Sequence, residues 1–426
     1  MRSVFRAVVA AMLTSLALPL SITAADPLPF PTEPRAPNFT APCIDGMANG
    51  FPCSNVDLLS FLPNDSIGGG RGSDVWGWQD PSNKREYALA GRETGTSFVD
   101  VTNPVQPLFL ANLPSAGTGN PVIWRDIKVY ADHAFVVAER PNHGMQVVDL
   151  RQLRDIKRSQ APATIGTVAH YTDFLRAHNI AINEDTGFAY AVGARNDIRA
   201  CAGGLHMIDI RNPASPTFAG CFAADGYTHD TECVVYEGPD GRFAGREICV
   251  NSNEDTITIV DVTNKAAPVM LSRTPYGGSA YVHQGWFVDG QRYFLSNDEL
   301  DELNFGHNTR TRVWDMASLT APQLIGMYDG PTPSTDHNLY IKGNFVYESN
   351  YRAGLRILSL DNVAQGQLEE VAFFDVYPPN DDPGFSFGTW SNYPYFEDPD
   401  IVVVHGYQGM FVVRPRLGSG AAGTGG

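Results

Sequence analysis

Six residues that could act as metal ligands or as general acids and bases recur at one position of a repeated segment. The segments that contain them read SDVWGW, RDIKVY, AHNIAI, THDTEC, VHQGWF and DHNLYI. The aligned residues are Asp74, Asp126, His178, His229, His283 and His337, and a seventh segment, FGTWSN, has Gly388 at this position. Imidazole and carboxylate groups that converge on one point are the donors that a divalent metal ion requires. The first hypothesis for this column of residues is therefore a metal or catalytic centre.

Two other interpretations of the column stay open. Repeats arise by duplication, so a structural histidine that bonds to the next repeat would be copied without any metal. A ligand could also be recognised by these side chains directly. The chain has only 10 histidines, and four of them in register argue against chance.

A second motif sets the architecture that must position this column. The pattern Gly-x-x-x-hydrophobic-Asp recurs, with variants, as GTSFVD, GMQVVD, GLHMID, DTITIVD, RTRVWD, GLRILS and GMFVV. Successive column positions lie 51 to 54 residues apart. Each repeat holds four short runs of β-branched and aromatic residues, which predict four strands and a propeller blade. A helical pattern occurs only in RQLRDIKRS.

Counting the repeats predicts an all-β, seven-bladed β-propeller with four-stranded blades over residues 55–416. The last repeat ends before its fourth strand, and residues 55–63 (NVDLLSFLP) have the pattern of a fourth strand. We expect this N-terminal strand to close the last blade, since closed rings protect sheet edges. An array of β-sandwiches is the weaker alternative. In the second repeat, ATIGTVAHY is the predicted fourth strand.

The ends of the second strands should open on the same mouth of the propeller as the column. Their polar residues are the candidates for ligand binding: Glu93, Glu139, Arg195, Glu254, Asp298, Glu299, His307, Asn350, Arg352 and His405. Polar groups on loops that a rigid scaffold holds commonly form binding sites. The longest loop is the acidic SNDELDELNFGHNTRTR. It lacks the spacing of an EF-hand calcium loop, which favours a solvated acidic loop over a calcium site.

Composition and the N-terminus indicate an exported protein. Residues 1–25 have the charged, apolar and small-residue parts of a signal peptide. We expect the exported chain to have no transmembrane segment. Residues 26–54 form an extension, and residues 417–426 a flexible Gly-rich tail. The net charge of −17 argues against nucleic acid as a partner.

The six cysteines agree with export, because an even number in an exported chain suggests disulfides. Pairing by proximity gives Cys43–Cys53, Cys201–Cys221 and Cys233–Cys249. Sequence motifs of nucleotide binding and of common hydrolases are absent: there is no Gly-x-Ser-x-Gly, P-loop or His-Glu-x-x-His.

The segments GLHMIDI and TIVDVTN resemble LVIVD repeats, and the larger pattern resembles the choice-of-anchor B family of exported bacterial proteins. The segments that carry this resemblance include WRDIKVYADHAFVVAE, AHNIAINEDTGFAYAVG, LDELNFGHNTRT and DHNLYIKGNFVYESNYRAGLRIL. The family name implies C-terminal surface-sorting signals. This chain departs from that pattern, since it ends in LGSGAAGTGG. The resemblance therefore implies a secreted, periplasmic or cell-surface protein and assigns no reaction.

We predict an exported binding or interaction protein that presents a polar channel mouth to an extracellular ligand, glycan or protein. A divalent metal ion at the propeller axis is the expected cofactor. The alternative is a metal-dependent enzyme, a hydrolase or an oxidoreductase, that uses the axial histidines. The layout alone is similar to that of carotenoid-cleaving oxygenases, seven-bladed propellers with four axial histidines on a metal, although no sequence motif links them to this chain.

Overall fold

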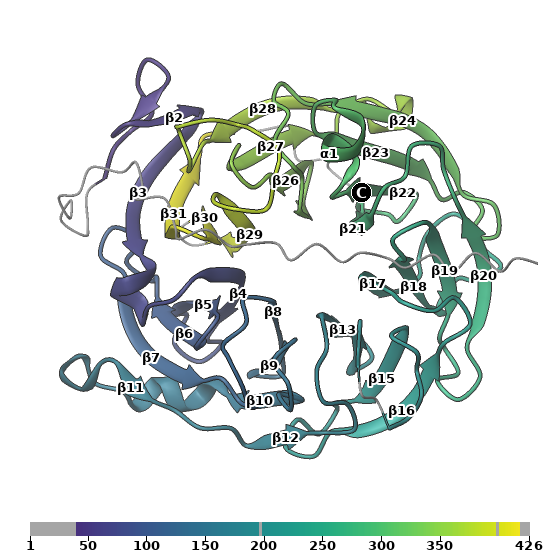
Figure 1. Cartoon of the computed structure of the whole chain (residues 1–426), viewed down its shortest axis with the longest axis horizontal. Helices are drawn as coiled ribbons and strands as arrows, with labels where there is room; N and C mark the ends of the chain where they lie inside the picture. Colours follow the sequence, from purple (N-terminus) through teal and green to yellow (C-terminus); the bar gives the residue numbers. More distant parts are fainter. Residues whose placement is uncertain (1–39, 196–197, 398–399, 418–426) are drawn as a thin grey trace, which may run out of the picture. The chain divides into compact units, whose positions relative to one another are not determined.

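The computed structural model of the chain describes residues 40–195, 198–397 and 400–417. These residues form seven antiparallel sheets that follow one another around a central axis (Figure 1). The predicted seven-bladed β-propeller is therefore confirmed. The predicted signal peptide, and all but the first residue of the predicted tail, lie outside the described residues.

Each blade contributes its first strand to the axis and its fourth strand to the rim. Blade 1 contains β4 (Gly72–Gln79), β5 (Glu86–Arg92), β6 (Gly95–Asp100) and β7 (Leu108–Pro114). Blade 2 contains β8 (Arg125–Tyr130), β9 (His133–Ala138), β10 (Met145–Asp149) and β12 (Ala169–Tyr171). Blades 3 and 4 contain β13 (Asn179–Asn183), β14 (Phe188–Val192), β15 (Leu205–Asp209) and β16 (Thr217–Phe222), then β17 (Asp230–Val235), β18 (Glu247–Ser252), β19 (Ile257–Asp261) and β20 (Val269–Thr274).

The remaining blades follow the same order. Blade 5 contains β21 (Val282–Phe287), β22 (Tyr293–Asp298), β23 (Arg310–Asp315) and β24 (Gln323–Asp329), and blade 6 contains β25 (Asn338–Lys342), β26 (Phe345–Ser349), β27 (Leu355–Ser359) and β28 (Glu369–Phe374). Blade 7 contains β29 (Thr389–Glu397), β30 (Asp400–Gly406), β31 (Gly409–Pro415) and β3 (Val56–Pro63). The helical elements are α1 (Asp301–Phe305), η1 (Asn64–Ile67), η2 (Leu150–Asp155), η3 (Arg158–Gln160) and η4 (Val363–Gln365).

The repeated Gly and Asp of the sequence motif have structural roles in the blades. The glycine at the start of the third strand faces a carbonyl of the fourth strand, which a Cβ would overlap, at Gly95, Gly204, Gly354 and Gly409. The aspartate at its end accepts a backbone N–H two residues later at 2.9 to 3.1 Å, in Asp100, Asp149, Asp209, Asp261 and Asp315. Such Asx turns direct the chain out of the strand. The motif thus specifies the turn into the fourth strand rather than a functional site.

The N-terminal strand closes the ring as predicted. β3 pairs antiparallel with β31, from Val56 opposite Pro415 to Pro63 opposite Gly409. The segment before it adds β2 (Phe51–Ser54) and β1 (Met47–Ala48) to the outer edge of blade 6. The extension therefore joins the last two blades.

The predicted fourth strand of blade 2 is only partly correct. ATIGTVAHY splits into β12, which pairs with β10, and β11 (Ala163–Thr164), which pairs in parallel with β7 of blade 1. The 3₁₀ helices η2 and η3 precede this segment, and Arg154 of η2 bonds to Asp80 of blade 1 at 2.7 Å. The chain therefore contacts blade 1 through η2 and β11 before it returns to blade 2 at β12.

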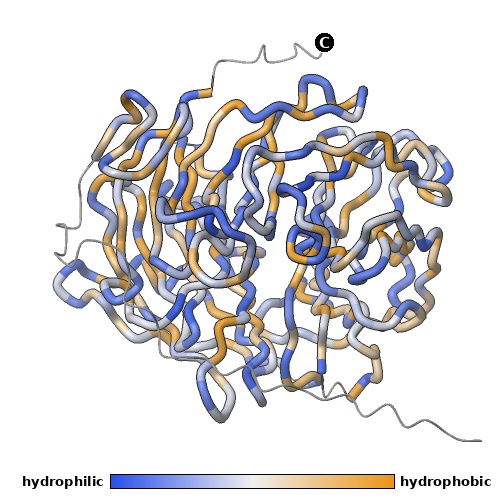
Figure 2. Tube along the Cα trace, turned by 45° about the horizontal axis from the view of Figure 1, so that its top comes forward, coloured by the Kyte–Doolittle hydropathy of each residue, from blue (hydrophilic) through white to orange (hydrophobic). Residues whose placement is uncertain are grey.

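Apolar side chains from neighbouring blades form the core. One cluster joins blades 7 and 1 around Leu62, Val99 and Val403, for example. Figure 2 shows hydrophobic stretches along the strands and many hydrophilic stretches in the turns. All three predicted disulfides are present: Cys43–Cys53, Cys201–Cys221 and Cys233–Cys249. Within the described ranges, none of the helices has the length and apolar character needed to span a membrane.

Candidate metal centre

The four histidines of the column lie side by side at one end of the channel. Each is the residue just before, or the second residue of, the innermost strand of its blade. The ring centroids of neighbours are 4.3 Å apart for His178 and His229, 4.1 Å for His229 and His283, and 4.4 Å for His283 and His337. The predicted convergence of the histidines from blades 3 to 6 is thus found in the structure.

Three of the histidines use Nδ1 for a bond to the protein. Nδ1 of His178 bonds to Glu139 Oε1 at 2.7 Å, Nδ1 of His229 to the carbonyl of His283 at 2.9 Å, and Nδ1 of His337 to the carbonyl of Trp390 at 2.5 Å. A carbonyl can only accept, so Nδ1 carries the proton and Nε2 keeps a free lone pair in His229 and His337. Metal-binding histidines show this arrangement, in which the second nitrogen donates to a carbonyl or carboxylate.

Glu299 brings a carboxylate to two of the histidines. Its Oε2 lies 3.7 Å from Nε2 of His283, and its Oε1 lies 3.7 Å from Nε2 of His337. Tyr351 donates a hydrogen bond to Oε1 at 2.8 Å, which fixes the carboxylate. Within the described residues, His283, Glu299 and His337 are the group whose ligand atoms all lie within 4.8 Å of one another.

His283 is the least satisfied member of this group. Its side chain is 1% exposed, and among the described residues neither ring nitrogen makes a hydrogen bond of normal geometry, although the backbone of His337 lies close enough to affect its pKa. A buried polar atom without a partner costs about 1 to 3 kcal/mol. Such an atom requires an explanation, for which a bound ion or water is the usual one.

Burial keeps the imidazoles of His229, His283 and His337 neutral. It lowers the pKa of His229 and His283 well below the usual range, and neighbouring histidines add to the effect. Burial also lowers the pKa of His337 to about 3 and raises the pKa of Glu299 to about 7. Neutral imidazole is the form that binds metal ions.

The two aspartates of the column act differently from the histidines. Asp74 accepts the N–H of Ile127 at 3.1 Å, and Asp126 accepts the N–H of Ile180 at 2.7 Å, each from the next blade. Asp126 also binds the ammonium of Lys128 at 2.7 Å. Neither aspartate belongs to the group around Glu299. These contacts are those expected if Asp74 and Asp126 have a structural role and bond to the next blade.

A small enclosed space separates the aspartates from the histidines. Its volume is about 10 Å³, and its lining residues include Asp74, Asp126, Lys128, His178, His229, Asp230 and His337. This is room for about one water molecule. Burial raises the pKa of Asp230 to about 7.

Other predicted rim residues are engaged in contacts within the protein. Asp298, Asn350 and His405 are buried, at 0%, 4% and 0% exposure. Glu93 bonds to Arg71 at 2.9 Å, and Arg352 donates to Asn380 at 2.7 Å.

Two further predicted rim residues take part in isolated backbone bridges. Arg195 and Glu254 pair through their backbones with Arg176 and Val282. A role of any of the rim residues in binding a ligand stays a prediction.

Two acids of the blade 5 loop are buried rather than solvated, which corrects part of the interpretation from its composition, whereas residues 303–306 of the same loop are exposed. Asp301 and Glu302 in α1 are 0% and 1% exposed. Asp301 bonds to Arg312 at 2.5 Å and lies 3.7 Å from His307 Nε2. Burial and the neighbouring Asp301 raise the pKa of Glu302 to about 9. These acids pack α1 against the sheet instead of facing water.

The opposite end of the channel holds two larger cavities, of about 240 and 440 Å³. They share Trp76, Val129, Glu184 and Trp286. These residues follow the column residues along the innermost strands, or lie just beyond the strand end. The cavities therefore open at the end away from the histidines.

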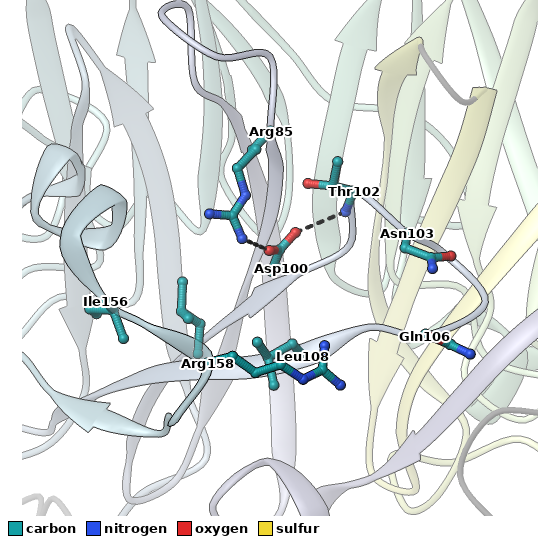
Figure 3. Close-up of a pocket in the computed structure, with 9 residues that line it drawn as sticks. Arg85, Asp100, Thr102, Asn103, Gln106, Leu108, Ile156 and Arg158 are labelled. Carbon is teal, nitrogen blue, oxygen red and sulfur yellow. Dashed lines mark hydrogen bonds and ion pairs between the residues drawn. The ribbon is translucent and has the colours of Figure 1, made fainter. Parts of the chain in front are cut away.

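A third cavity, of about 390 Å³, lies on the rim of blade 1 (Figure 3). Arg85 and Asp100 form an ion pair in it, and Ile156 and Arg158 of the 3₁₀ segment cover one side. The N–H of Thr102 also bonds to Asp100, so this carboxylate is occupied by the protein.

Three residues at the axis were missed as partners of the column. The sequence places Glu299 on the rim, because the path of the loop after β22 decides whether its carboxylate comes near the axis. Asp230 directly follows His229, and Lys128 lies two residues after Asp126, on the same face of a strand. The two-residue spacing between Asp126 and Lys128 is the sequence signal that predicts Lys128 beside the column.

Comparison with solved structures finds a β-propeller domain of similar fold. The chain is similar to the β-propeller domain of Cps50 (Swd1) from Myceliophteria thermophila, with 11% identity and a TM-score of 0.50, over 81% of this chain and 96% of that one. It is also similar to the computationally designed Ika8 protein, with 12% identity and a TM-score of 0.49, over 85% of this chain and 93% of that one. No curated protein sequence matches the chain.

The LVIVD repeat model matches residues 198–223 and 248–274. These ranges contain the two outer strands of blade 3 and the three outer strands of blade 4. The chain therefore contains LVIVD repeats, as the sequence predicted, and they form blades of a β-propeller.

Proposed function

We propose that this protein is an exported binding protein that holds a divalent transition-metal ion at the axial group His283, Glu299 and His337. One observation carries the proposal. Nε2 of His337 has its lone pair free because Nδ1 donates to Trp390, yet this nitrogen faces an acceptor oxygen of Glu299 at 3.7 Å. Two acceptors that face each other in a buried site repel unless a cation or a shared proton lies between them, and 3.7 Å is too long for a direct O–H···N hydrogen bond.

The geometry of the group suits such an ion. Two atoms that each bind a tetrahedral zinc ion at about 2.1 Å lie about 3.4 Å apart, which is close to the observed separations of 3.7 Å. Two imidazoles and one carboxylate are the donor set that zinc and non-haem iron sites use. His229 contacts His283 on the other side and so completes the wall of the site.

Export is supported by the three disulfides, which form in oxidising compartments. The likeness to the choice-of-anchor B family, with the signal-peptide pattern of residues 1–25, supports the same location. The LVIVD propeller supports an interaction role.

Elemental analysis of protein purified without a His tag and loaded with Zn²⁺, Co²⁺ or Mn²⁺ tests the proposal. We expect one ion per chain, lost in the double variant His283→Ala, His337→Ala. The matched control is His170→Ala, which removes an exposed histidine of β12. A protein that takes up no metal under any loading condition would refute the site.

A metal-dependent enzyme is the second candidate, because three protein ligands leave a coordination position open for water or substrate. Metal-loaded protein is assayed with ester, phosphate-ester and peroxide substrates. Turnover that the double histidine variant loses supports a hydrolase or an oxidoreductase. If the metal-loaded protein shows no turnover in any of these assays, the enzyme candidate is rejected and only the binding role remains.

A further inference from the structure

The channel end away from the histidines has a continuous aromatic wall. The Trp76 ring lies 5.3 Å from the Tyr393 ring and 5.6 Å from the Tyr340 ring, and the Trp286 ring lies 5.1 Å from the Tyr340 ring. These residues come from β4, β29, β25 and β21, the innermost strands of four consecutive blades. Tyr395 of β29 lies 5.3 Å from Tyr393 and extends the wall.

The wall formed by blades 3 and 4 is acidic. Glu184 and Asp185 follow β13, Glu232 belongs to β17, and all three line the cavity of about 240 Å³. Lys128 is the one cationic side chain among the described residues that line the two cavities, and Asp126 already neutralises it at 2.7 Å. The two walls together offer π-faces and the carboxylates of Glu184 and Asp185 in the same space, whereas Glu232 accepts the N–H of Phe287 at 2.6 Å and burial raises its pKa well above the usual range.

The protein itself shows how a cation is held here. The ammonium of Lys128 lies 4.5 Å from the centroid of the Trp76 ring. An ammonium group over an indole face within about 6 Å is attracted by the ring quadrupole.

We propose that this end of the channel binds a small organic cation, an amine or a quaternary ammonium compound. Its charged group lies against Trp286, since the Lys128 ammonium already lies over the Trp76 ring, and Glu184 and Asp185 supply the opposite charge. The larger cavity, of about 440 Å³, has the size of a small-molecule site. Anionic ligands are excluded because the lining carboxylates repel them.

Titration with choline and tetramethylammonium, followed by calorimetry and tryptophan fluorescence, tests this site. The comparison ligand is 3,3-dimethylbutan-1-ol, which has the shape of choline without its charge. We expect saturable binding of the two cations, and binding of the alcohol that is about 10-fold weaker. Equal binding of choline and the alcohol, or no saturable binding of either cation, overturns the proposal, as does binding of glucose in their place.

Variants separate the two walls. Trp286→Ala should abolish choline binding, and Glu184→Gln, which changes an exposed side chain, should weaken it several-fold without affecting the fold. Trp124→Ala is the control, since Trp124 is 46% exposed and does not line either cavity. If Glu184→Gln binds choline as the natural chain does, the acidic wall has no role and the proposal fails.

The site is independent of the metal centre at the other end of the channel. The variant His283→Ala, His337→Ala should therefore bind choline with unchanged affinity. Loss of choline binding in this folded variant would show that the cation is recognised at the histidines, which contradicts the placement.

Discussion

Arg125 donates a hydrogen bond from Nη1 to Nε2 of His143 at 3.1 Å, within blade 2. Nδ1 of His143 donates to the carbonyl of Gly144 at 3.0 Å, so the buried imidazole is neutral. Burial lowers the pKa of His143 to about 3, and the Arg125 charge adds to the effect. Protonation would place two cations side by side in the interior.

This pair predicts a loss of stability in mild acid. The unfolded chain takes up the His143 proton at about pH 6.5, whereas the folded chain does so only near pH 3. The free energy of unfolding therefore falls as the pH drops below about 6.5, by about 2 kcal/mol at pH 5 from this group. Urea unfolding at pH 7.5 and pH 5 should show a smaller fall in His143→Gln. The same fall in both proteins would contradict the assignment.

A second prediction concerns the structural role of Asp126. Asp126→Ala leaves the Lys128 ammonium unpaired, with a side chain only 12% exposed, which should lower the free energy of unfolding by about 3 to 5 kcal/mol. Adding Lys128→Met should restore part of the loss, because the buried charge is gone. Asp255→Ala, in an exposed ion pair with Arg273, should cost less than about 1 kcal/mol.

Denaturant unfolding of these variants, with metal content measured in parallel, decides between the two interpretations of the aspartates. A stable Asp126→Ala protein that has lost its metal would place Asp126 among the ligands.

The third prediction concerns ring closure. Leu62 of β3 is 6% exposed and packs between blades 7 and 1. Leu62→Ala should lower the free energy of unfolding by about 2 to 5 kcal/mol. Val269→Ala, at a side chain 56% exposed in β20, should change it by less than about 0.5 kcal/mol. Equal effects in urea unfolding would mean that β3 adds little to the ring.

The fourth prediction concerns the orientation of Glu299. Tyr351→Phe removes the hydrogen bond to Oε1, and loss of such a supporting contact typically lowers metal affinity about 10-fold or more. Competition with a chromophoric chelator measures this affinity. Tyr328→Phe, in β24 at the rim, is the control. Unchanged affinity in Tyr351→Phe would show that Glu299 is fixed by other contacts.

The fold was predictable because each repeated residue makes the same local contact in several blades. Asp209 and Asp261, for example, accept the N–H two residues ahead in the same kind of turn. β11 was not predictable, because it leaves its own repeat to pair with blade 1, and the bond between Arg154 and Asp80 that accompanies this has no counterpart in the repeat.

The candidate site was predictable where it depends on strand register. The four histidines occupy equivalent positions on inner strands, so their approach follows from the period. Glu299 comes from a loop after β22, whose course is set by α1 and by the buried Asp301. Asp74 and Asp126 share the column, but a carboxylate can accept a backbone N–H from the next blade, and here it does. Residue type alone does not show whether an aspartate accepts a backbone N–H or binds a metal ion.

The pairing of β3 with β31 has a consequence for the order in which the chain is made. β3 leaves the ribosome among the first strands, whereas its partner at residues 409–415 leaves last. Until β31 has been made, the edge of β3 that it will pair with stays open, and open strand edges promote aggregation. The ring therefore cannot close before residues 409–415 have been synthesised.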